Sequence, residues 1–211
     1  MQRARFITFE GGEGSGKTTQ IQRLVGRLQP LVGEVVTTRE PGGSIGAEQI
    51  RNLLVNGPPE RWSAAAETLL MYAARRDHIE RFITPALGHG AWVICDRFHD
   101  STRAYQGAAG GAPAALIDAL EHSVLEGVKP DLTLILDIPA EIGLARAAMR
   151  DDGEARFESK GLEFHERLRQ AYLHIARREP ERCFVIDAQG SIEQIEGRIW
   201  AAVCERLGVP A

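Results

Sequence analysis

The 211-residue sequence has few cysteines, no long apolar run and no excess of positive charge. Its three cysteines, Cys95, Cys183 and Cys204, are too scattered for a disulfide framework, which favours a reduced, cytoplasmic setting. No apolar run reaches about 18 residues, and the N-terminus MQRARFITFEG fits no signal peptide, so we expect no membrane insertion. A net charge of −4 argues against a partner such as nucleic acid, because proteins that follow nucleic acid carry a basic field.

The chain also lacks a Pro/Gly/Ser-rich linker, a repeat and a low-complexity segment, so we expect a single domain over residues 1–211. Short apolar runs alternate with longer segments of helical periodicity, which is typical of parallel sheets with crossover helices. We predict a three-layer α/β fold with a five-stranded parallel sheet flanked by helices. The predicted strands are residues 6–9, 34–38, 91–96, 132–137 and 183–187. The predicted helices are residues 18–28, 45–55, 64–87, 113–125, 141–149, 162–178 and 192–207.

Residues 11–18, GGEGSGKT, match G-x-x-x-x-G-K-[ST] at every fixed position, between a predicted strand and a predicted helix. In such a loop the backbone N–H groups can wrap a polyphosphate, because few Cβ atoms hinder their approach. Lys17 would reach the terminal phosphates, and the Thr18 hydroxyl would bind Mg²⁺. The alternative is an ordinary glycine turn before a helix, but both flanks favour a P-loop NTPase fold. The residues predicted to bind the triphosphate are Gly11, Gly12, Glu13, Gly14, Ser15, Gly16, Lys17, Thr18 and Thr19.

Carboxylates stand where the predicted strands end. Asp96, Asp137 and Asp187 close three of the five strands, and the first strand runs into Glu10. The loops at the carboxyl ends of parallel strands are the usual place for function. Because Asp96 ends a buried strand expected beside the P-loop strand, we predict that it lies at the Mg²⁺ site.

The block after that strand, DRFHDSTRAYQG, is dense in side chains that bind ligands. Arg97 offers a cation where an acceptor phosphate would arrive. Hydroxyl, guanidinium, ring and amide groups follow it at Ser101, Arg103, Tyr105 and Gln106. Arg39, in the turn sequence REPGG after the second strand, could add a bidentate phosphate donor. Taken alone, Arg39 would be interpreted as a solvated surface arginine.

The predicted helix 64–87 carries a further pair of candidates. Met71 and Arg75 are four residues apart and so share a face. One could cover a flat base while the other holds a phosphate or a base edge. The alternative places Met71 in the core and the arginines in solvent, and periodicity alone favours that alternative.

Together these residues resemble the thymidylate kinase family. The resemblance covers nearly the whole chain, through FEGGEGSGKTTQ, TREPGG, YAAR, ICDRFHDSTRAYQG, LILD and RFESKGLEFHERLRQAYL. The block DR-F-x-x-S-x-x-A-Y-Q is the most specific part, since many unrelated NTPases share the P-loop. The resemblance implies phosphorylation of dTMP to dTDP with ATP as the donor, dependence on Mg²⁺, and a homodimer.

The resemblance also implies roles for individual residues. Glu13 would interact with the region of the sugar 3′-hydroxyl and with Mg²⁺-bound water, while Arg39 and Arg97 would clamp the acceptor phosphate. Tyr105 would pack beside the deoxyribose. The remaining positions implied for the substrate pocket are Met71, Arg75, Asp96, Ser101 and Gln106. At Met71 the family usually has a phenylalanine that stacks on thymine, so here either the base is held more loosely or another side chain compensates.

Residues 150–161, RDDGEARFESKG, form a polar segment between two predicted helices. Such a charge run is usually a solvated loop. Alternatively, as the resemblance implies, it is a short lid that closes over ATP and brings a guanidinium to the transferred phosphoryl group. Arg156 is the first candidate for that catalytic role, beside Lys17, Glu13 and Arg97, and Arg150 is the second.

Three other functions remain as alternatives. A regulatory GTPase should carry an N-K-x-D motif, and the sequence has none. Adenylate and uridylate kinases usually carry Gly-Pro-Gly where this chain has Gly12-Glu13-Gly14. A DNA-associated ATPase is disfavoured by the acidic balance. The six histidines have no ligand spacing such as HExxH, so we expect neither a metal cluster nor a nucleophile dyad.

Overall fold

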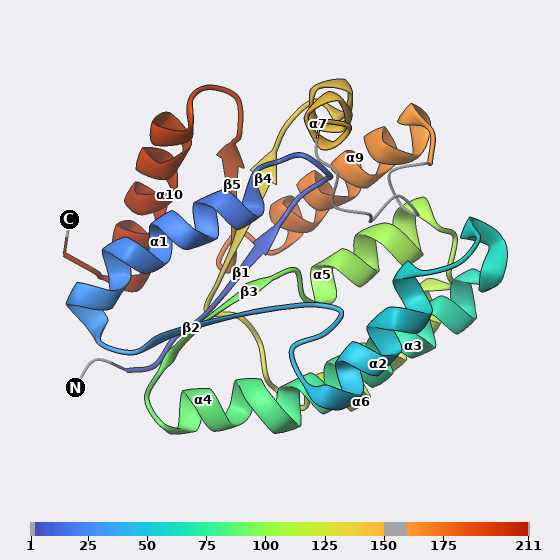
Figure 1. Cartoon of the computed structure of the whole chain (residues 1–211), viewed down its shortest axis with the longest axis horizontal. Helices are drawn as coiled ribbons and strands as arrows, with labels where there is room; N and C mark the ends of the chain where they lie inside the picture. Colours follow the sequence, from blue (N-terminus) through green and yellow to red (C-terminus); the bar gives the residue numbers. More distant parts are fainter. Residues whose placement is uncertain (1–2, 150–159, 211) are drawn as a thin grey trace.

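A single parallel sheet organises the computed structural model, which describes residues 3–149 and 160–210. Its strand order is β2-β3-β1-β4-β5, with every neighbouring pair parallel, as Figure 1 shows. The strands are β1 Phe6–Glu10, β2 Val35–Arg39, β3 Trp92–Asp96, β4 Leu132–Asp137 and β5 Cys183–Asp187. The predicted strands are therefore confirmed to within one residue at each end. Because β1 is the central strand, the loop that follows it lies in the middle of the sheet's carboxyl edge.

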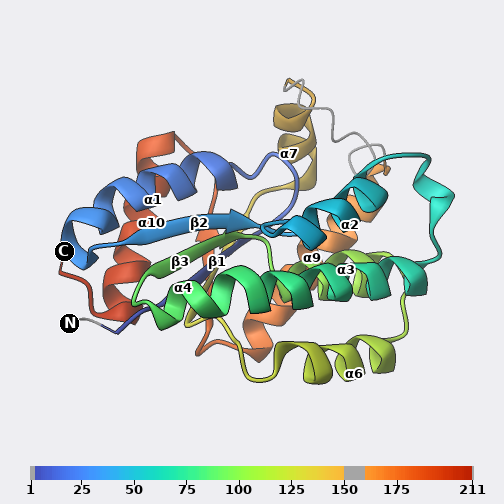
Figure 2. The same cartoon turned by 60° about the horizontal axis from the view of Figure 1, so that its bottom comes forward.

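Helices cover both faces of the sheet, as Figures 1 and 2 show. On one face, α1 (Lys17–Val32) and α10 (Ile192–Leu207) pack on the side chains of Ile7, Phe9 and Ile94. Alternate residues of the same strands, such as Phe6 and Val93, point to the opposite face. The helical segments on that side are α2 (Ile45–Val55), α3 (Ala64–His78), η2 (Ile79–Ile83), α4 (Thr84–Gly88), α5 (His99–Thr102), η3 (Arg103–Ala109), α6 (Ala114–Leu125) and α9 (Leu162–Arg178). The three predicted layers are confirmed.

Two helical segments differ from the sequence prediction. The predicted helix 64–87 is interrupted by the π-helical turn η2 before it continues as α4. Pro85 gives the reason, because a regular α-helix would press its ring against the carbonyl group four residues earlier. The π turn changes that register, and its closing N–H, from Thr84, bonds to the carbonyl oxygen of Ile79. The second segment, after β3, is more helical than expected and contains α5 and the π-helical η3.

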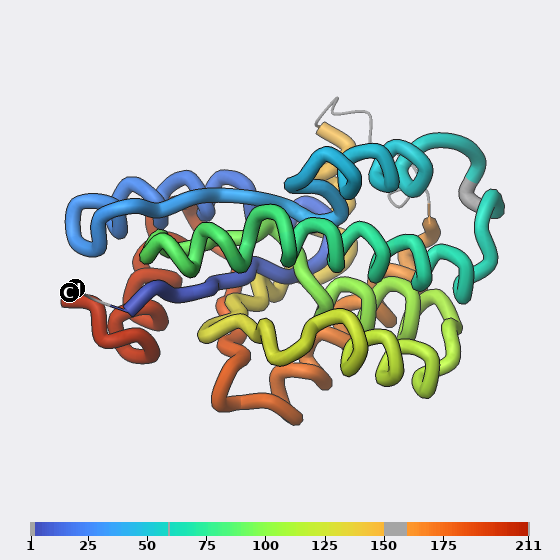
Figure 3. Tube along the Cα trace, turned by 90° about the horizontal axis from the view of Figure 1, so that it is seen from below, coloured from blue at the N-terminus to red at the C-terminus, as the bar shows by residue number. Residues whose placement is uncertain are grey.

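Smaller differences concern where helices start and stop. Helix α1 runs to Val32, four residues beyond the prediction, and ends at Gly33 with a φ of 89°. Helix α7 spans Ala140–Ala147 rather than 141–149. Figure 3, like Figures 1 and 2, shows both ends of the described chain on the side of the molecule away from α2. Among the described residues, no helix is both long and apolar enough to cross a membrane.

Candidate active site

The loop of residues 11–16, here called the phosphate loop, joins β1 to α1 and packs closely against its neighbours. Gly11 has a φ of 135° and Gly14 a φ of 65°, both in the region that favours glycine. A Cβ at Gly11 would lie 2.5 Å from the carbonyl oxygen of Leu136, and one at Gly14 would collide with the carbonyl oxygen of Gly143 in α7. These two glycines are therefore required by packing against the protein itself.

Lys17, the first residue of α1, folds its side chain back over the phosphate loop. Its Nζ donates to the carbonyl oxygens of Gly11 and Gly12, each at 3.3 Å, and lies 3.5 Å from Ser15 Oγ. Burial and the nearby Arg97 lower the pKa of Lys17. The ammonium group is thus held by neutral oxygens, and an incoming phosphate could replace them.

Thr18 and Asp96 bring two oxygen ligands together at the start of α1. The Thr18 hydroxyl lies 3.5 Å from Asp96 Oδ2. The other carboxylate oxygen, Oδ1, is buried and has no hydrogen-bond partner among the described residues. Hydroxyl and carboxylate oxygens are the ligands that Mg²⁺ prefers, so the pair fits such an ion. Thr19, which was predicted to bind the triphosphate, is exposed on α1.

Arg97 connects the phosphate loop to the rest of the site. It adopts a φ of 68°, which is unusual for a residue with a Cβ. Its guanidinium pairs with Glu13 at 3.0 Å, donates to the Gly11 carbonyl oxygen at 3.0 Å, and stacks over the Tyr105 ring at 4.8 Å. The Tyr105 hydroxyl in turn donates to Glu13 at 2.6 Å. Burial opposes the charge of Glu13, but Arg97 and Lys17 outweigh it and lower the pKa of Glu13 to about 2.

A cavity of about 80 Å³, here called the polar pocket, opens beside Arg97. Its lining includes the predicted residues Glu13, Met71, Arg75, Arg97, Ser101, Tyr105 and Gln106, with Glu40, Arg51 and Phe98 in addition. The analysis of the sequence therefore identified many of the residues that line the polar pocket. It did not identify the residues that hold those side chains in position.

Arg75 lies in the wall of the polar pocket and is only 2% exposed. The interpretation that the arginines of this helix face solvent is therefore wrong for Arg75. Its Nε donates to Glu40 at 2.7 Å, and its Nη2 donates to the Phe98 carbonyl oxygen and to Thr102 Oγ1. Burial disfavours the charge, but Glu40 outweighs it and raises the pKa of Arg75. The remaining nitrogen, Nη1, is buried without a partner among the described residues, so it can donate to a ligand.

Behind Arg97 lies a carboxylate that the sequence analysis noted only as a strand end. Glu10 accepts hydrogen bonds from Phe98 N at 2.8 Å, Ser101 Oγ at 2.6 Å and Tyr172 Oη at 3.0 Å. Burial and the neighbouring Asp100 raise the pKa of Glu10 to about 7, although its hydrogen bonds act in the opposite direction. Glu10 thereby fixes the start of the segment that carries Arg97 and Ser101.

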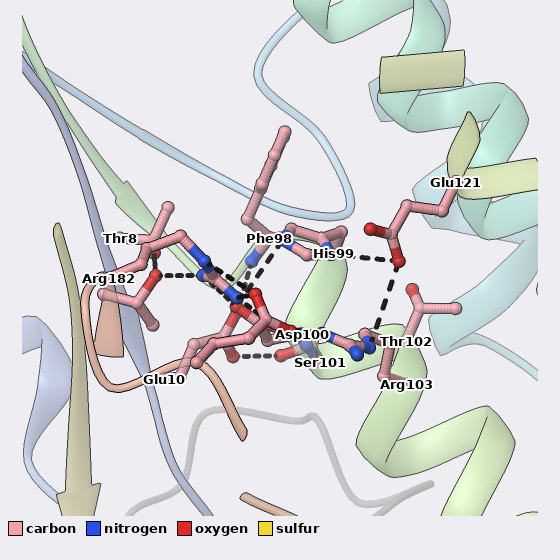
Figure 4. A network of polar contacts seen from close by, with 12 residues as sticks. Thr8, Glu10, Phe98, His99, Asp100, Ser101, Thr102, Arg103, Glu121 and Arg182 are labelled. Carbon is pink, nitrogen blue, oxygen red and sulfur yellow. Dashed lines mark hydrogen bonds and ion pairs between the residues drawn. The ribbon is translucent and has the colours of Figure 1, made fainter. Parts of the chain in front are cut away.

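A second group of buried charges lies beside Glu10, as Figure 4 shows. Arg182 donates to both oxygens of Asp100, at 2.6 and 3.1 Å, and to Thr133 Oγ1 at 2.6 Å. Thr133 in turn shares a hydrogen bond with Thr8 in β1. Burial opposes the charge of Asp100, but His99 and Arg182 hold the pKa of Asp100 well below its usual range. This group ties the segment after β3 to the sheet.

Some predicted residues are not brought to the polar pocket. Arg39 is 53% exposed and pairs with Glu48 at 3.1 Å. Arg51, which was not predicted, lines the pocket instead and donates to the Pro41 carbonyl oxygen at 2.7 Å. Arg150 and Arg156, the candidates for a lid arginine, lie outside the described residues.

The residues at or behind the pocket that the analysis of the sequence did not assign include three carboxylates, one arginine and one tyrosine. They are Glu10, Glu40, Glu67, Arg51 and Tyr172. Glu67 had a usable signal, since it lies one helical turn before Met71 on the same face of α3. Tyr172 had none, because its spacing in α9 is that of a core residue.

The central phosphate loop, the paired Thr18 and Asp96 oxygens and the adjoining polar pocket define a P-loop protein of the small-molecule kinase class. The sequence matches the thymidylate kinase family over residues 9–199. The chain belongs to that family.

Individual relatives agree with this assignment. The thymidylate kinase of Caulobacter vibrioides is 64% identical over 209 residues, which are 99% of this chain and 100% of that protein. The thymidylate kinase of Rhodopseudomonas palustris is 54% identical and covers 99% of this chain, with 92% of its own length matched. The crystal structure of thymidylate kinase from Ehrlichia chaffeensis superposes with a TM-score of 0.78 at 36% identity, covering 95% of this chain and 98% of that one.

Proposed function

We propose that this protein transfers the γ-phosphoryl group of ATP to dTMP and so forms dTDP. Membership of the thymidylate kinase family supports the reaction. The observation that carries the proposal at the level of residues is that Arg97 contacts both the phosphate loop and the polar pocket. A group bound on either side would therefore meet the same guanidinium. Phosphoryl transfer requires donor and acceptor groups that lie close together and in line, and a guanidinium that reaches both sides favours that placement.

On the donor side, the backbone N–H groups of the phosphate loop and Lys17 would hold the triphosphate. Thr18 and Asp96 would hold Mg²⁺, and Glu13 would reach it through water. The ion would neutralise charge on the donor phosphates. An arginine from residues 150–161, with Arg156 ahead of Arg150, would add a further positive charge.

On the acceptor side, Arg97 would hold the dTMP phosphate, and Arg39, at the carboxyl end of β2, would assist it after leaving its ion pair with Glu48. Met71 would lie against the base, with Ser101 and Tyr105 beside the nucleoside and Glu13 near the 3′-hydroxyl. The unpartnered Nη1 of Arg75 supports its assignment to an acceptor atom of the base edge. No general base is required, because the acceptor phosphate is already an anion at neutral pH.

The single domain over residues 1–211, the cytoplasmic location and the homodimer stay predictions from the sequence. Exposed apolar side chains on the helices above the polar pocket, such as Leu53 and Leu69, favour a dimer through that surface. Sedimentation equilibrium would distinguish a dimer from a monomer.

The reaction is tested with dTMP, dUMP, UMP, dGMP and AMP as acceptors, with ATP as donor, in the presence of Mg²⁺ or a chelator. Turnover of dTMP well above the others, lost with chelator and in Lys17→Met, is the expected result. Equal or faster turnover of another acceptor would refute the substrate assignment and leave the P-loop kinase architecture standing.

A further inference from the structure

Glu67 has no place in the reaction described so far, yet it is buried one helical turn before Met71, which lines the polar pocket. It is 6% exposed and lies on the same face of α3 as Met71 and Arg75, at positions i, i+4 and i+8. Its Oε1 accepts a hydrogen bond of 2.8 Å from the amide nitrogen of Gln106 in η3. Gln106 lines the pocket and is itself 2% exposed.

The chemistry of this pair fixes how the Gln106 amide is oriented. A carboxylate has only acceptor oxygens, whereas an amide has a donor NH₂ at one end and an acceptor oxygen at the other. The NH₂ end must therefore face Glu67, because the opposite orientation would bring two acceptors together. The amide oxygen is left for the pocket, and it makes no hydrogen bond among the described residues.

Together, Gln106 and Arg75 present one acceptor and one donor to whatever enters. The donor is the buried Nη1 of Arg75, which has no partner among the described residues. A thymine or uracil ring offers the complement, an N3–H donor beside an O4 acceptor. Cytosine offers the reverse at both positions, an unprotonated N3 and an amino group.

We propose that Glu67 is a positioning residue that holds the Gln106 amide with its oxygen toward the base, and that it thereby selects 4-oxo pyrimidine nucleotides over 4-amino ones. The inference rests on the proposed dTMP pocket. Glu67 does not touch the base; it acts only through Gln106. Without an acceptor-only neighbour, the amide could turn over and present its NH₂ to cytosine N3.

The test compares kcat/KM for dTMP and dCMP in the unmodified protein and in Glu67→Gln. The substitution keeps the size of the side chain but lets position 67 donate as well as accept. We expect the dTMP-to-dCMP ratio to fall by roughly tenfold or more, mainly through KM, since one buried hydrogen bond is exchanged for a mismatch. If Glu67 had only a structural role, the substitution would lower kcat/KM for dTMP and for dCMP by the same factor and leave their ratio unchanged.

The matched control is the exchange Glu67→Gln with Gln106→Glu, which keeps one carboxylate and one amide at these two positions. There the new carboxylate accepts from both Gln at position 67 and the base N3–H, so we expect the dTMP preference to recover. Thermal unfolding verifies that each variant is folded. If Glu67→Gln does not fold, the dTMP-to-dCMP ratio of the exchange variant carries the test. A folded Glu67→Gln with the original ratio, or an exchange variant without recovery, would overturn the inference. Failure of the unmodified protein to phosphorylate dTMP would instead refute the proposed function.

Discussion

The phosphate loop and the polar pocket meet at Arg97, yet they hold their charged groups in different ways. In the loop, the Lys17 ammonium contacts main-chain carbonyl oxygens and one serine hydroxyl. In the pocket, Arg75 is committed to a carboxylate, Glu40, at 2.7 Å. A phosphate can replace the neutral oxygens around Lys17 without leaving a charge unpaired. Separating Arg75 from Glu40, in contrast, would leave a buried charge unpaired and would cost much free energy.

Because of this difference, the effect of a substitution on activity can be separated from its effect on folding stability. Substitutions on the loop side should affect activity and leave folding stability almost unchanged. Substitutions in the pocket should affect both, because the groups that would read the base are also buried in the core. Measuring kcat, KM and the free energy of unfolding in the same variants therefore tests the comparison directly.

The largest effect is expected from Arg75→Met. Removing the guanidinium takes away the Arg75 partner of the buried Glu40 carboxylate. Among the described residues, that carboxylate then keeps only its side-chain contact with the His78 ring at 2.9 Å, so the free energy of unfolding should fall by about 3–5 kcal/mol. The KM for dTMP should rise as well, because Nη1 is lost. Urea unfolding and steady-state kinetics measure the two effects.

The matched control is Arg76→Met, one residue along the same helix. Arg76 also makes two ion pairs, with Glu80 and Glu126, but they lie at the surface. Stability should change little there, because solvent screens such pairs. Equal losses in the two variants would show that burial of the pair is not the cause.

The second largest effect is expected from Lys17→Met, on the other side of the comparison. Loss of one preorganised cation from the transferred phosphoryl group should lower kcat by roughly 10²–10³-fold. Stability should hold or rise slightly, because the lowered pKa of Lys17 indicates that burial disfavours its charge. A loss of stability similar to that of Arg75→Met would contradict the distinction between the two sides.

Glu10 should give a smaller effect that depends on pH. Since its pKa is raised from 4.5 to about 7 in the folded protein, the folded state binds more protons than the unfolded state between these values. The contribution of Glu10 to stability is therefore fully present at acid pH and is lost as pH rises through this window, by up to about 3 kcal/mol.

Glu10→Gln removes that titration. Relative to the unmodified protein, the variant should become steadily more stable as pH rises through the window. Urea unfolding at pH values below, within and above it measures the difference. A difference that does not vary with pH would mean that Glu10 is already ionised throughout.

The phosphate loop could be predicted because the residues that define its motif are consecutive in the sequence. The same holds for most of the segment after β3, which brings to the polar pocket Arg97, Ser101, Tyr105 and Gln106. Arg103 pairs with Glu179 instead. Spacing and residue type were enough in both cases. The sheet was predicted equally well, because alternating apolar runs mark buried parallel strands.

The supports of the polar pocket could not be predicted in this way. Periodicity alone favours solvent for Arg75, and the structure buries it because Glu40 arrives from a segment 35 residues earlier. The Glu10 bond to Tyr172 spans 162 residues. No local pattern carries such pairings, which depend on how the segments pack. Gly11 and Gly14 were expected to clear space for phosphate, and their conformations are also dictated by β4 and α7.

The smallest effect is expected from Met71→Phe, which sharpens the comparison within the pocket itself. Met71 is 9% exposed and lines the polar pocket beside Arg75, which is one helical turn further along α3. A phenylalanine, which the family resemblance leads one to expect here, would offer a flat ring to the base, worth about 0.5–1.5 kcal/mol. The KM for dTMP should therefore fall by roughly two- to tenfold with little change in kcat. Met71→Leu, which has similar volume and no ring, should not reproduce the gain. A higher KM together with lower stability in Met71→Phe would mean that the ring collides with the fixed groups around it, so that the rigidity of this side, rather than the missing ring, sets how tightly the base is held.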